Sequence, residues 1–541
     1  MTKARNVADI IKQPFTTTLG TSNYRAGVNA GNSIASGGNF NVVVGDEAGT
    51  AITTGLKNVA VGMDAMGTNV DGDGNVAVGY QALKTMEPAN GFSFNTAVGA
   101  QAGLSVTSSV KNTLIGSLAG DGITSGDGLN VAVGVGALGA ASNNTQENVA
   151  IGNDALSTED GHGRNVAVGF EALKTLNAGA LALNTAVGQQ AGKAMTTGVN
   201  NTLIGGQAGD ALTDADFNVA VGRNALSADT LGSTSIAIGH AALETQNFTS
   251  AANTYNVAIG HVAGQSITTG SVNTLIGGLS GDAITTGVYN VTLGVSTLGA
   301  NTGAHKNTAI GSNSMVAFNV TSNTDTFNTA VGYGSAIALT TGVQNTFVGA
   351  LAGDDLTTGS NNTIIGYGCN INAVGQDHGI ALGHNVGVSA NDFSFGKSGN
   401  KVTNDFDTDA NWSRSSDERL KKNITDQTLG LDFINDLRTV KYNWKASNEL
   451  DSSDSQLAHL YKENPADNEM NTNATMHNFI AQEVKAALDT AGVSNFAGWK
   501  EDEKGVQQVS REMFVIPLVK AIQELSAKND ALAARIATLE G

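Results

Sequence analysis

The stretch Asn58-Val59-Ala60-Val61-Gly62 recurs, with small variations, from Asn41 to about Gly383. Its general form is Asn-[Val/Thr]-x-[Val/Ile/Leu]-Gly, and thirteen of the nineteen intervals between successive motif glycines are 17 residues long, the others 18 to 21. Side chains alternate between the faces of a strand, so Val59 and Val61 share one face and Ala60 lies on the other. Glycine then permits a corner that a Cβ would hinder. One such unit cannot bury its apolar face alone, so the motif predicts a parallel β-solenoid stabilised by stacking of its coils.

Three further features of the repeat support this prediction. A second small apolar contact follows three to four residues after the glycine, as in Ala65, Ala82-Leu83 and Ala102-Gly103. The asparagine that starts each motif is expected to stack on its equivalent in the next coil and hydrogen-bond along the ladder. Twenty coils at ~4.8 Å each would give a rod of roughly 95 Å. A longer motif, Asn-Thr-Leu-Ile-Gly followed by Ala-Gly-Asp or Ser-Gly-Asp, recurs at 112–121, 201–210 and 273–282, with a close relative at 345–354.

The alternating small residue of the motif predicts an assembly. Alanine occupies it in most repeats, at Ala60, Ala77, Ala97, Ala132, Ala150 and Ala167. An alanine-lined face allows close approach of another backbone, and three chains around an axis would bury it. We therefore expect a homotrimer, with a monomeric solenoid that exposes an alanine-lined surface as the alternative. The motif is similar to the head repeats of trimeric autotransporter adhesins and to the shafts of many phage tail fibres.

Composition narrows the class of protein. The chain has 541 residues, of which 68 are glycine and only 14% are charged, typical of packing through small side chains and backbone ladders. A net charge of −19 argues against nucleic-acid binding by charge alone. The single Cys369 excludes an intrachain disulfide framework. No apolar run is long enough for a membrane span, and the start of the chain lacks the apolar segment of a signal peptide, so we expect folding in the cytoplasm.

Candidate ligand sites within the repeats are few. The turn that contains Asn69, Asp71 and Asp73 imitates the start of a calcium loop, but Tyr80 stands where such a loop has glutamate, so a polar turn is expected. His240 and His261 follow the motif glycine in consecutive coils and are expected to stack; His384 has the same phase. Other side chains vary at that position, which is typical of a solvent-facing place. We predict no metal and no cofactor. Phosphate-loop and metalloprotease motifs are absent from the sequence, and no paired-carboxylate glycosidase constellation can be singled out.

The ends of the repeat region have other compositions. Residues 1–40 lack the motif and are basic, which predicts a docking segment for another protein, with a disordered cap as the alternative. Residues 384–415 break the period and gather aromatic side chains, which predicts a neck where the rod closes. These aromatics are Phe393, Phe395, Phe406 and Trp412.

The C-terminal part changes character. Helical spacing over 429–437 and 478–488, strand alternation over 440–444 and a polar loop over 446–476 predict a small α+β domain at 416–512. Residues 513–541 predict a coiled coil, with a heptad seam formed by Val515, Leu518, Ile522, Leu525, Asn529, Leu532, Ile536 and Leu539. Asn529 falls at an a position, where a polar residue fixes register. A coiled coil requires partners, but this seam alone leaves two and three strands open.

A serine and a lysine lie at the join of the two parts. Ser416 precedes Lys421 by five residues, which is not a helical contact spacing, although the two could meet across a turn or between subunits. A serine hydroxyl becomes a nucleophile when an adjacent unprotonated amine takes its proton. From these residues alone, a charged linker is the competing interpretation.

The surrounding motifs resemble those of one family. Ser416-Asp-Glu-Arg419-Leu-Lys421-Lys-Asn-Ile424 is followed by 430–437, by Val440-Lys-Tyr-Asn-Trp444, by 479–484 and by the terminal heptads. Together they resemble the C-terminal intramolecular chaperone domain of phage tailspikes and fibres, of the endosialidase type. The resemblance implies a domain that trimerises, drives folding of the upstream rod and cuts itself off. It further implies Ser416 as nucleophile, Lys421 as its base, Asp417 and Arg419 as supporting residues, and Ser415–Ser416 as the scissile bond.

The predicted protein is mostly β, with a trimeric parallel β-solenoid shaft at 41–383, a neck at 384–415 and an α+β chaperone domain that ends in a coiled coil. We expect a bacteriophage tail fibre, located in the virion tail, that docks to a tail or baseplate protein through residues 1–40. Its other partner would be a host surface glycan or protein, with no nucleic acid and no membrane insertion. Its only predicted chemistry is one self-cleavage. A tailspike depolymerase acting on surface polysaccharide and a bacterial trimeric adhesin are the alternatives; the sequence features above weigh against the adhesin.

Overall fold

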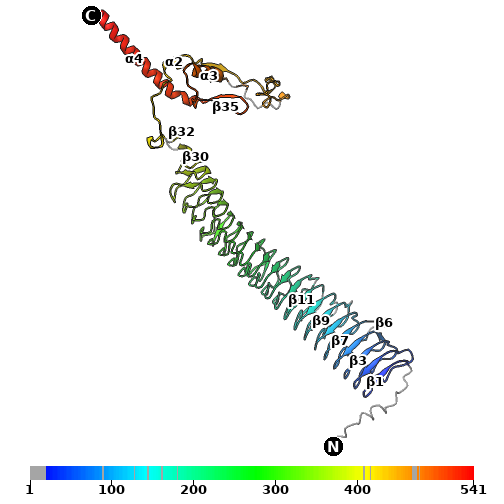
Figure 1. Cartoon of the computed structure of the whole chain (residues 1–541). Coiled ribbons are helices and arrows are strands. Elements are labelled where there is room, and N and C mark those ends of the chain that lie inside the picture. The colour runs from blue at the N-terminus through cyan, green and yellow to red at the C-terminus, as the bar shows by residue number, and fades with distance from the viewer. Residues whose placement is uncertain are drawn as a thin grey trace. The chain divides into compact units, whose positions relative to one another are not determined.

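A computed structural model describes residues 20–87, 91–126, 128–142, 145–159, 163–179, 181–405, 409–414, 416–465, 472–473 and 475–541 (Figure 1). The chain divides into two compact units, Met1–Ser415 and Ser416–Gly541. The first unit is a long stack of coils, and the second is a small domain with a long terminal helix. The division falls at the predicted junction between neck and chaperone domain.

The stack is built on one ladder of short strands, one for each coil. Every strand pairs in parallel with the next, in the register that places equivalent motif residues side by side, as in Val59↔Val76 and Ala60↔Ala77. Among the described residues the ladder consists of β1 (Tyr24–Ala26), β2 (Val42–Val44), β3 (Val59–Val61), β5 (Val76–Val78), β7 (Thr96–Val98), β8 (Thr113–Ile115), β9 (Val131–Val133), β10 (Val149–Ile151), β11 (Val166–Val168), β12 (Thr185–Val187), β13 (Thr202–Ile204), β14 (Val219–Val221), β16 (Ile236–Ile238), β18 (Val257–Ile259), β19 (Thr274–Ile276), β20 (Val291–Leu293), β22 (Thr308–Ile310), β24 (Thr329–Val331), β25 (Thr346–Val348), β26 (Thr363–Ile365) and β28 (Ile380–His384). The predicted β-solenoid is confirmed.

The stack begins one coil earlier than the motif indicates. β1 lies within residues 1–40, where the sequence shows no repeat, yet it pairs in parallel with β2. The backbone N–H of Asn41 donates to Oδ1 of Asn23 at 2.8 Å, the same bond that joins later coils. The rest of the predicted docking segment, residues 1–19, lies outside the described residues.

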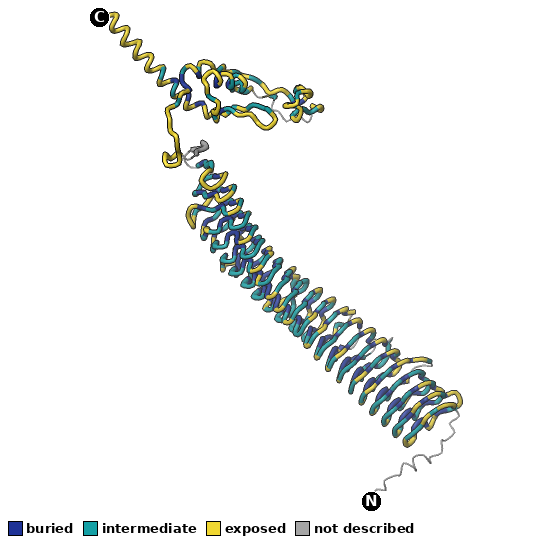
Figure 2. The backbone as a smooth tube through the Cα atoms, in the orientation of Figure 1, coloured by how far each residue is buried: buried dark blue, intermediate teal, exposed yellow. Residues whose placement is uncertain are grey.

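The alanine face of the motif is the interior of the solenoid, which corrects the expectation that it would meet another chain. Ala60, Ala77 and Ala150 are fully buried, whereas Val59 and Val61 lie on the outside of the coil and are half-buried. Figure 2 shows the buried residues running along the inside of the stack. The reason is volume, because each coil is too narrow to hold two large side chains from one strand together with the wall opposite.

The opposite wall compensates for the size of this inward residue. Where the strand carries Ala77, the wall carries Leu83, and both are fully buried. Leu114 on the strand faces Gly120 in its own coil and Gly103 in the coil before, and a Cβ on either glycine would come within 2.8 Å of the leucine side chain. The two versions of the repeat are therefore two solutions to the same core volume.

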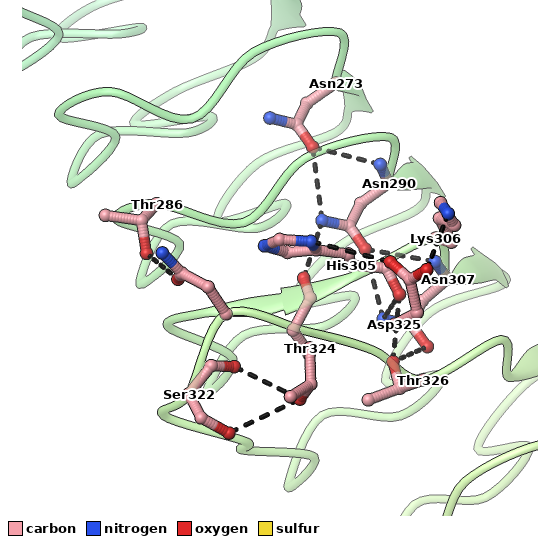
Figure 3. Close-up of polar contacts among 12 residues, drawn as sticks. Asn273, Thr286, Asn290, His305, Lys306, Asn307, Ser322, Thr324, Asp325 and Thr326 are labelled. Atoms are coloured by element: carbon pink, nitrogen blue, oxygen red, sulfur yellow. Dashed lines mark hydrogen bonds and ion pairs between the residues drawn. The ribbon is translucent and has the colours of Figure 1, made fainter.

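A ladder of buried asparagines joins the coils, as predicted, and Ser235 takes the place of asparagine in the coil of β16. The backbone N–H of Asn290 donates to Oδ1 of Asn273 at 3.0 Å, and that of Asn307 donates to Oδ1 of Asn290 at 3.1 Å (Figure 3). Nδ2 of Asn290 also donates to the carbonyl of Ala304 at 3.0 Å. These bonds satisfy buried backbone groups that the strands leave unpaired, which is why the position tolerates so little variation along the chain.

We expect Asn201→Leu to destabilise the shaft by roughly 2–4 kcal/mol. The substitution leaves a buried backbone N–H and a buried carbonyl without a hydrogen-bond partner, and each such group costs about 1–3 kcal/mol. Oδ1 of Asn201 accepts from the N–H of Asn218 at 2.9 Å, and its Nδ2 donates to the carbonyl of Ala215 at 2.7 Å. The matched control is Asn200→Leu, the same change one residue earlier at an exposed position where another coil already carries Leu183. Thermal unfolding followed by circular dichroism measures both; equal midpoints for the two variants would contradict the role of the ladder.

Pairs of two-residue parallel strands lie beside the main ladder, at three long coils (those of β6, β17 and β23) and at the end of the stack. These are β4 (Gly72–Asp73) with β6 (Gly91–Phe92), β15 (Gly232–Ser233) with β17 (Ala252–Asn253), β21 (Ala304–His305) with β23 (Thr324–Asp325), and β27 (Asn370–Ile371) with β29 (Gly387–Val388). The extra residues of a long coil are therefore accommodated at its edge, and the main ladder keeps its register.

The neck ends the parallel ladder. β30 (Asp392–Lys397) pairs in parallel with β28, but β31 (Asn400–Asp405) and β32 (Asp409–Arg414) then turn back antiparallel. Phe393 and Phe395 lie with ring centroids 5.5 Å apart, so these predicted aromatics do meet. Phe406 and the side chain of Trp412 lie outside what is described. Antiparallel strands cover the sheet edge that an unfinished solenoid would present.

The second unit is α+β, as predicted, with α2, β33, α3 and α4 at or within a few residues of their expected places and further short elements that were not predicted. They are η1 (Glu418–Leu420), α2 (Leu431–Asn435), β33 (Val440–Tyr442), η2 (Ser447–Glu449), β34 (Met476–Asn478), α3 (Ala481–Thr490), β35 (Trp499–Glu501), β36 (Gln507–Val509), η4 (Arg511–Phe514) and α4 (Val515–Glu540). Phe433, Val484 and Phe514 form its small core with their apolar neighbours. The carboxylate of Glu524 on α4 accepts from the N–H of Leu431 at 2.8 Å and so caps α2. No described helix combines the length and apolar character that a bilayer span requires.

Candidate functional site

The first residues of the second unit form a single turn. Asp417 is extended (φ −64°, ψ 133°) and its carboxylate accepts from the N–H of Arg419 at 2.9 Å, so that it caps η1. The backbone N–H of Lys421 donates to the carbonyl of Glu418 and closes the turn. A tight 3₁₀ turn reverses the chain over five residues, a separation that would not place two side chains together on an α-helix.

This turn brings the predicted serine and lysine together. Nζ of Lys421 donates to Oγ of Ser416 at 2.8 Å. The distance is within hydrogen-bond reach, the geometric requirement for proton transfer between a nucleophile and its base. The contact is formed within one chain. Ser415, on the other side of the predicted scissile bond, lies outside the described residues.

The two supporting residues hold the turn in shape. The guanidinium of Arg419 donates to the Asp417 carboxylate from Nε at 3.0 Å and from Nη2 at 2.6 Å, a forked pairing that fixes both side chains. Hydrogen bonds from Arg419 lower the pKa of Asp417, and the same pairing raises the pKa of Arg419. The Asp417 carboxylate therefore stays charged at neutral pH, which keeps the turn closed.

The turn is open to water in the single chain. Ser416 and Lys421 are exposed, and so are two large apolar residues beside them, Leu420 at 70% and Ile424 at 65%. A lysine amine accepts a proton only after losing its own, and exclusion of water favours the neutral amine. The chain thus supplies the contact between the Ser416 hydroxyl and the Lys421 amine, and leaves both groups in contact with water.

The calcium-like turn is satisfied by its own coils. Asn69 bonds to the backbone of Gly72, Asp71 accepts from Thr53 and Thr54, and Asp73 accepts from the N–H of Leu56. These contacts bind Oδ1 of each of the three side chains to neighbouring groups of the solenoid, as expected of a polar turn.

The histidine rings stack along the solenoid. His240 lies on His261 with centroids 5.3 Å apart, as predicted, and His384 lies on Tyr367 at 5.5 Å. Within the described ranges, no group of three or more His, Cys, Asp or Glu side chains is placed to hold a metal ion.

One polar cluster was missed by sequence reasoning. Asp325 pairs with Lys306 at 2.6 Å and lies 3.7 Å from Nδ1 of His305 (Figure 3). Lys306 also stands over the ring of Phe327. The pairing of β21 with β23 sets His305 opposite Asp325. Only the 21-residue interval between motif glycines hinted at an irregularity here. The cluster fastens a long coil to its neighbour.

Comparison with known proteins agrees with this division of the chain. Residues 416–493 match the model of a family described as chaperone of endosialidase. The match starts at Ser416, the residue that begins the second compact unit and carries the hydroxyl of the serine–lysine contact. No curated protein matches the chain. A chaperone-of-endosialidase domain that follows a long β-solenoid shaft fits a tail-fibre or endosialidase-type protein.

Proposed function

We propose that this chain, a solenoid shaft followed by a chaperone-of-endosialidase domain, forms a homotrimeric bacteriophage tail fibre that binds a host surface receptor and processes itself at Ser415–Ser416. The observation that carries the proposal is the 2.8 Å contact between Lys421 and Ser416 at the first residues of the matched domain, directly after the shaft in sequence. In this proposal residues 1–40 dock to a tail or baseplate protein, and the fibre resides in the virion tail.

The residues at the contact suffice for one cleavage. Neutral Lys421 takes the hydroxyl proton as Oγ of Ser416 adds to the carbonyl carbon of Ser415, forming a cyclic tetrahedral intermediate. The proton returns to the amide nitrogen of Ser416 as the C–N bond breaks, leaving an ester between Ser415 and Oγ of Ser416. Water hydrolyses the ester to a carboxylate on Ser415 and a free amine and hydroxyl on Ser416. No further reactant is needed.

The terminal helix supports assembly. Seven apolar positions of the α4 seam are 47–79% exposed in the single chain: Val515, Leu518, Ile522, Leu525, Leu532, Ile536 and Leu539. An apolar stripe with heptad spacing is buried when parallel copies pack knobs into holes. Packing of three copies sets the chains in register before the shafts fold, which offsets the loop-closure cost of non-local parallel pairing.

Covering of the turn at 416–421 follows from the same assembly. Leu420 and Ile424 are apolar and exposed, so a neighbouring chain that packs against them would also shield the Lys421 amine from water. Cleavage would then follow trimerisation. Removal of the registry domain leaves the shaft folded behind a high unfolding barrier, which is the property of kinetic stability.

A test of assembly and receptor binding uses one variant pair. In a Ser416→Ala background, which keeps the chain whole, we expect a mass in solution of three times 54.9 kDa. Ile522→Asp should abolish assembly, because an unpaired carboxylate buried in the seam costs several kcal/mol. Ala527→Asp, on the outer face of the same helix, should assemble normally.

The same proteins test binding to the host. Excess trimer, and excess Ala527→Asp, should slow adsorption of the phage that carries this fibre to its host cells, whereas Ile522→Asp should not. A monomeric wild type would contradict the proposed trimer. A trimer that leaves adsorption unchanged would contradict receptor binding.

A further inference from the structure

The outward face of the solenoid sheet is apolar along its whole length. On each strand of the ladder the first and third residues point away from the core. From β2 to β26 every one of these residues is Val, Ile, Leu or Thr, and none is charged, in a chain whose net charge is −19. Third-position residues such as Ile115, Ile204 and Leu293 remain 39–47% exposed although coils above and below cover them. An exposed apolar surface of this extent is unusual on a soluble monomer.

Register makes this surface a pair of straight rows. Parallel pairing sets Thr202 beside Val219 and Ile204 beside Val221, and the same holds at each step of the ladder. Consecutive coils stand ~4.8 Å apart, so the rows extend for roughly 85 Å with one branched side chain per step. The third-position row contains only Val, Ile and Leu, and threonine is confined to the first-position row.

Charged side chains of the coils lie elsewhere on the coil. Asp64 pairs with Lys84 at 3.1 Å, and Glu171 pairs with Lys174 and Lys193 at 2.7 Å. All of these residues follow the motif glycine and belong to the wall opposite the strands, whereas two other ion pairs, Arg164–Glu147 and Lys306–Asp325, lie at the corner before the motif asparagine. The wall carries the polarity expected of a surface in water, and the sheet face does not.

The period of the rows identifies what covers them. A partner must present small branched side chains at the spacing of one coil, for the full length of the shaft. A second copy of the same chain, parallel and in register, meets both requirements, because equivalent residues face each other around a common axis. The heptad seam of α4, which also requires parallel copies, is independent support for that arrangement.

We propose that the outward sheet face, formed by the first and third residues of the strands from β2 to β26, is the surface through which copies of this chain pack in the shaft. The proposal rests on the proposed trimer and names the surface that the trimer buries. It places the third-position row nearest the axis. The wall that carries the ion pairs remains in contact with solvent and is left for partners of another kind.

Cysteine cross-linking tests the proposal on the intact protein. Cys369 is the chain's single cysteine and is fully buried, so wild type controls for its reactivity. Ile204→Cys places a thiol in the third-position row. Thr196→Cys places one at an exposed site outside the strands and is the matched control. Both are made in the Ser416→Ala background, their trimeric mass is verified, and a homobifunctional maleimide is added before denaturing electrophoresis.

We expect Ile204→Cys to give a covalent dimer in most of the protein and Thr196→Cys to remain monomeric. Reactivity with a monofunctional maleimide should fall at least tenfold for Ile204→Cys on assembly, by comparison with the same variant carrying Ile522→Asp. If the trimer forms but Ile204→Cys stays uncross-linked and fully reactive, the proposed packing surface is wrong and the proposed trimer is still supported. If no trimer forms, both the surface and the proposed function fail.

Discussion

Wild-type protein is expected to separate on a denaturing gel into two fragments, one ending at Ser415 and one beginning at Ser416, while Ser416→Ala runs as a single chain of 54.9 kDa. Cleavage of Ser416→Ala should be abolished, because alanine lacks the hydroxyl oxygen that attacks the peptide bond. Mass spectrometry of the smaller fragment should identify Ser416 as its new N-terminus. The expected loss of cleavage is at least a thousandfold in rate, about 4 kcal/mol in the barrier.

The lysine is tested with its neighbour as control. Lys421→Met should stop cleavage, because it removes the only amine described within reach of the Ser416 hydroxyl while keeping the length of the side chain. Lys422→Met removes the same charge one residue further on and should leave cleavage intact. Wild type that stays whole although it assembles and folds would refute self-cleavage, and equal rates for both lysine variants would refute the role of Lys421.

The second large effect is expected at a motif glycine. Gly205 has φ +134°, and a Cβ there would stand 2.6 Å from the backbone of Gly222 in the next coil. Gly205→Ala should therefore prevent normal stacking of two coils. The backbone conformation alone costs about 1–3 kcal/mol for a residue with a Cβ, and the clash with main-chain atoms is added to that. We expect poor yield of folded protein and rapid proteolysis within the shaft.

The residue next to it provides the control. Gly206→Ala adds the same methyl group, but that Cβ would have no neighbour closer than 4.0 Å, and the backbone at residue 206 does not have a positive φ. This variant should match wild type in thermal midpoint and protease resistance. Similar behaviour of the two alanine variants would show that the corner tolerates a side chain and would remove the steric basis of the repeat.

The course of the chain in the shaft was predictable from its motif, but the inside of the coil was not. Alternation along Val59, Ala60 and Val61 defines two faces without saying which is buried. A small residue fits a close contact between chains as well as it fits a narrow core. The signal that decides between them lies in pairs of positions: Leu83 accompanies Ala77, whereas Gly120 accompanies Leu114. Such exchange of volume occurs only between side chains that share one interior.

Two other features could not be foreseen for different reasons. The coil at β1 has Tyr24 and Arg25 where the motif has small apolar residues, so stacking is preserved by the asparagine bond and the corner while the pattern is lost. The contact of Ser416 with Lys421 depends on a 3₁₀ turn that Asp417 caps. The sequence indicates Asp417 as a cap residue. It does not indicate which of several turn conformations the five residues after Ser416 adopt.

The stacking described above also bears on how such a gene can change. Each coil contacts only the coils before and after it, and most coils present the same asparagine, strand and glycine to both neighbours. Duplication or deletion of whole coils by recombination between near-identical repeats therefore creates no new kind of junction. A shift of one or two residues within a strand, by contrast, would exchange its inner and outer faces or break its register. The length of the shaft is thus a heritable quantity that changes in steps of one coil, on the order of 5 Å each.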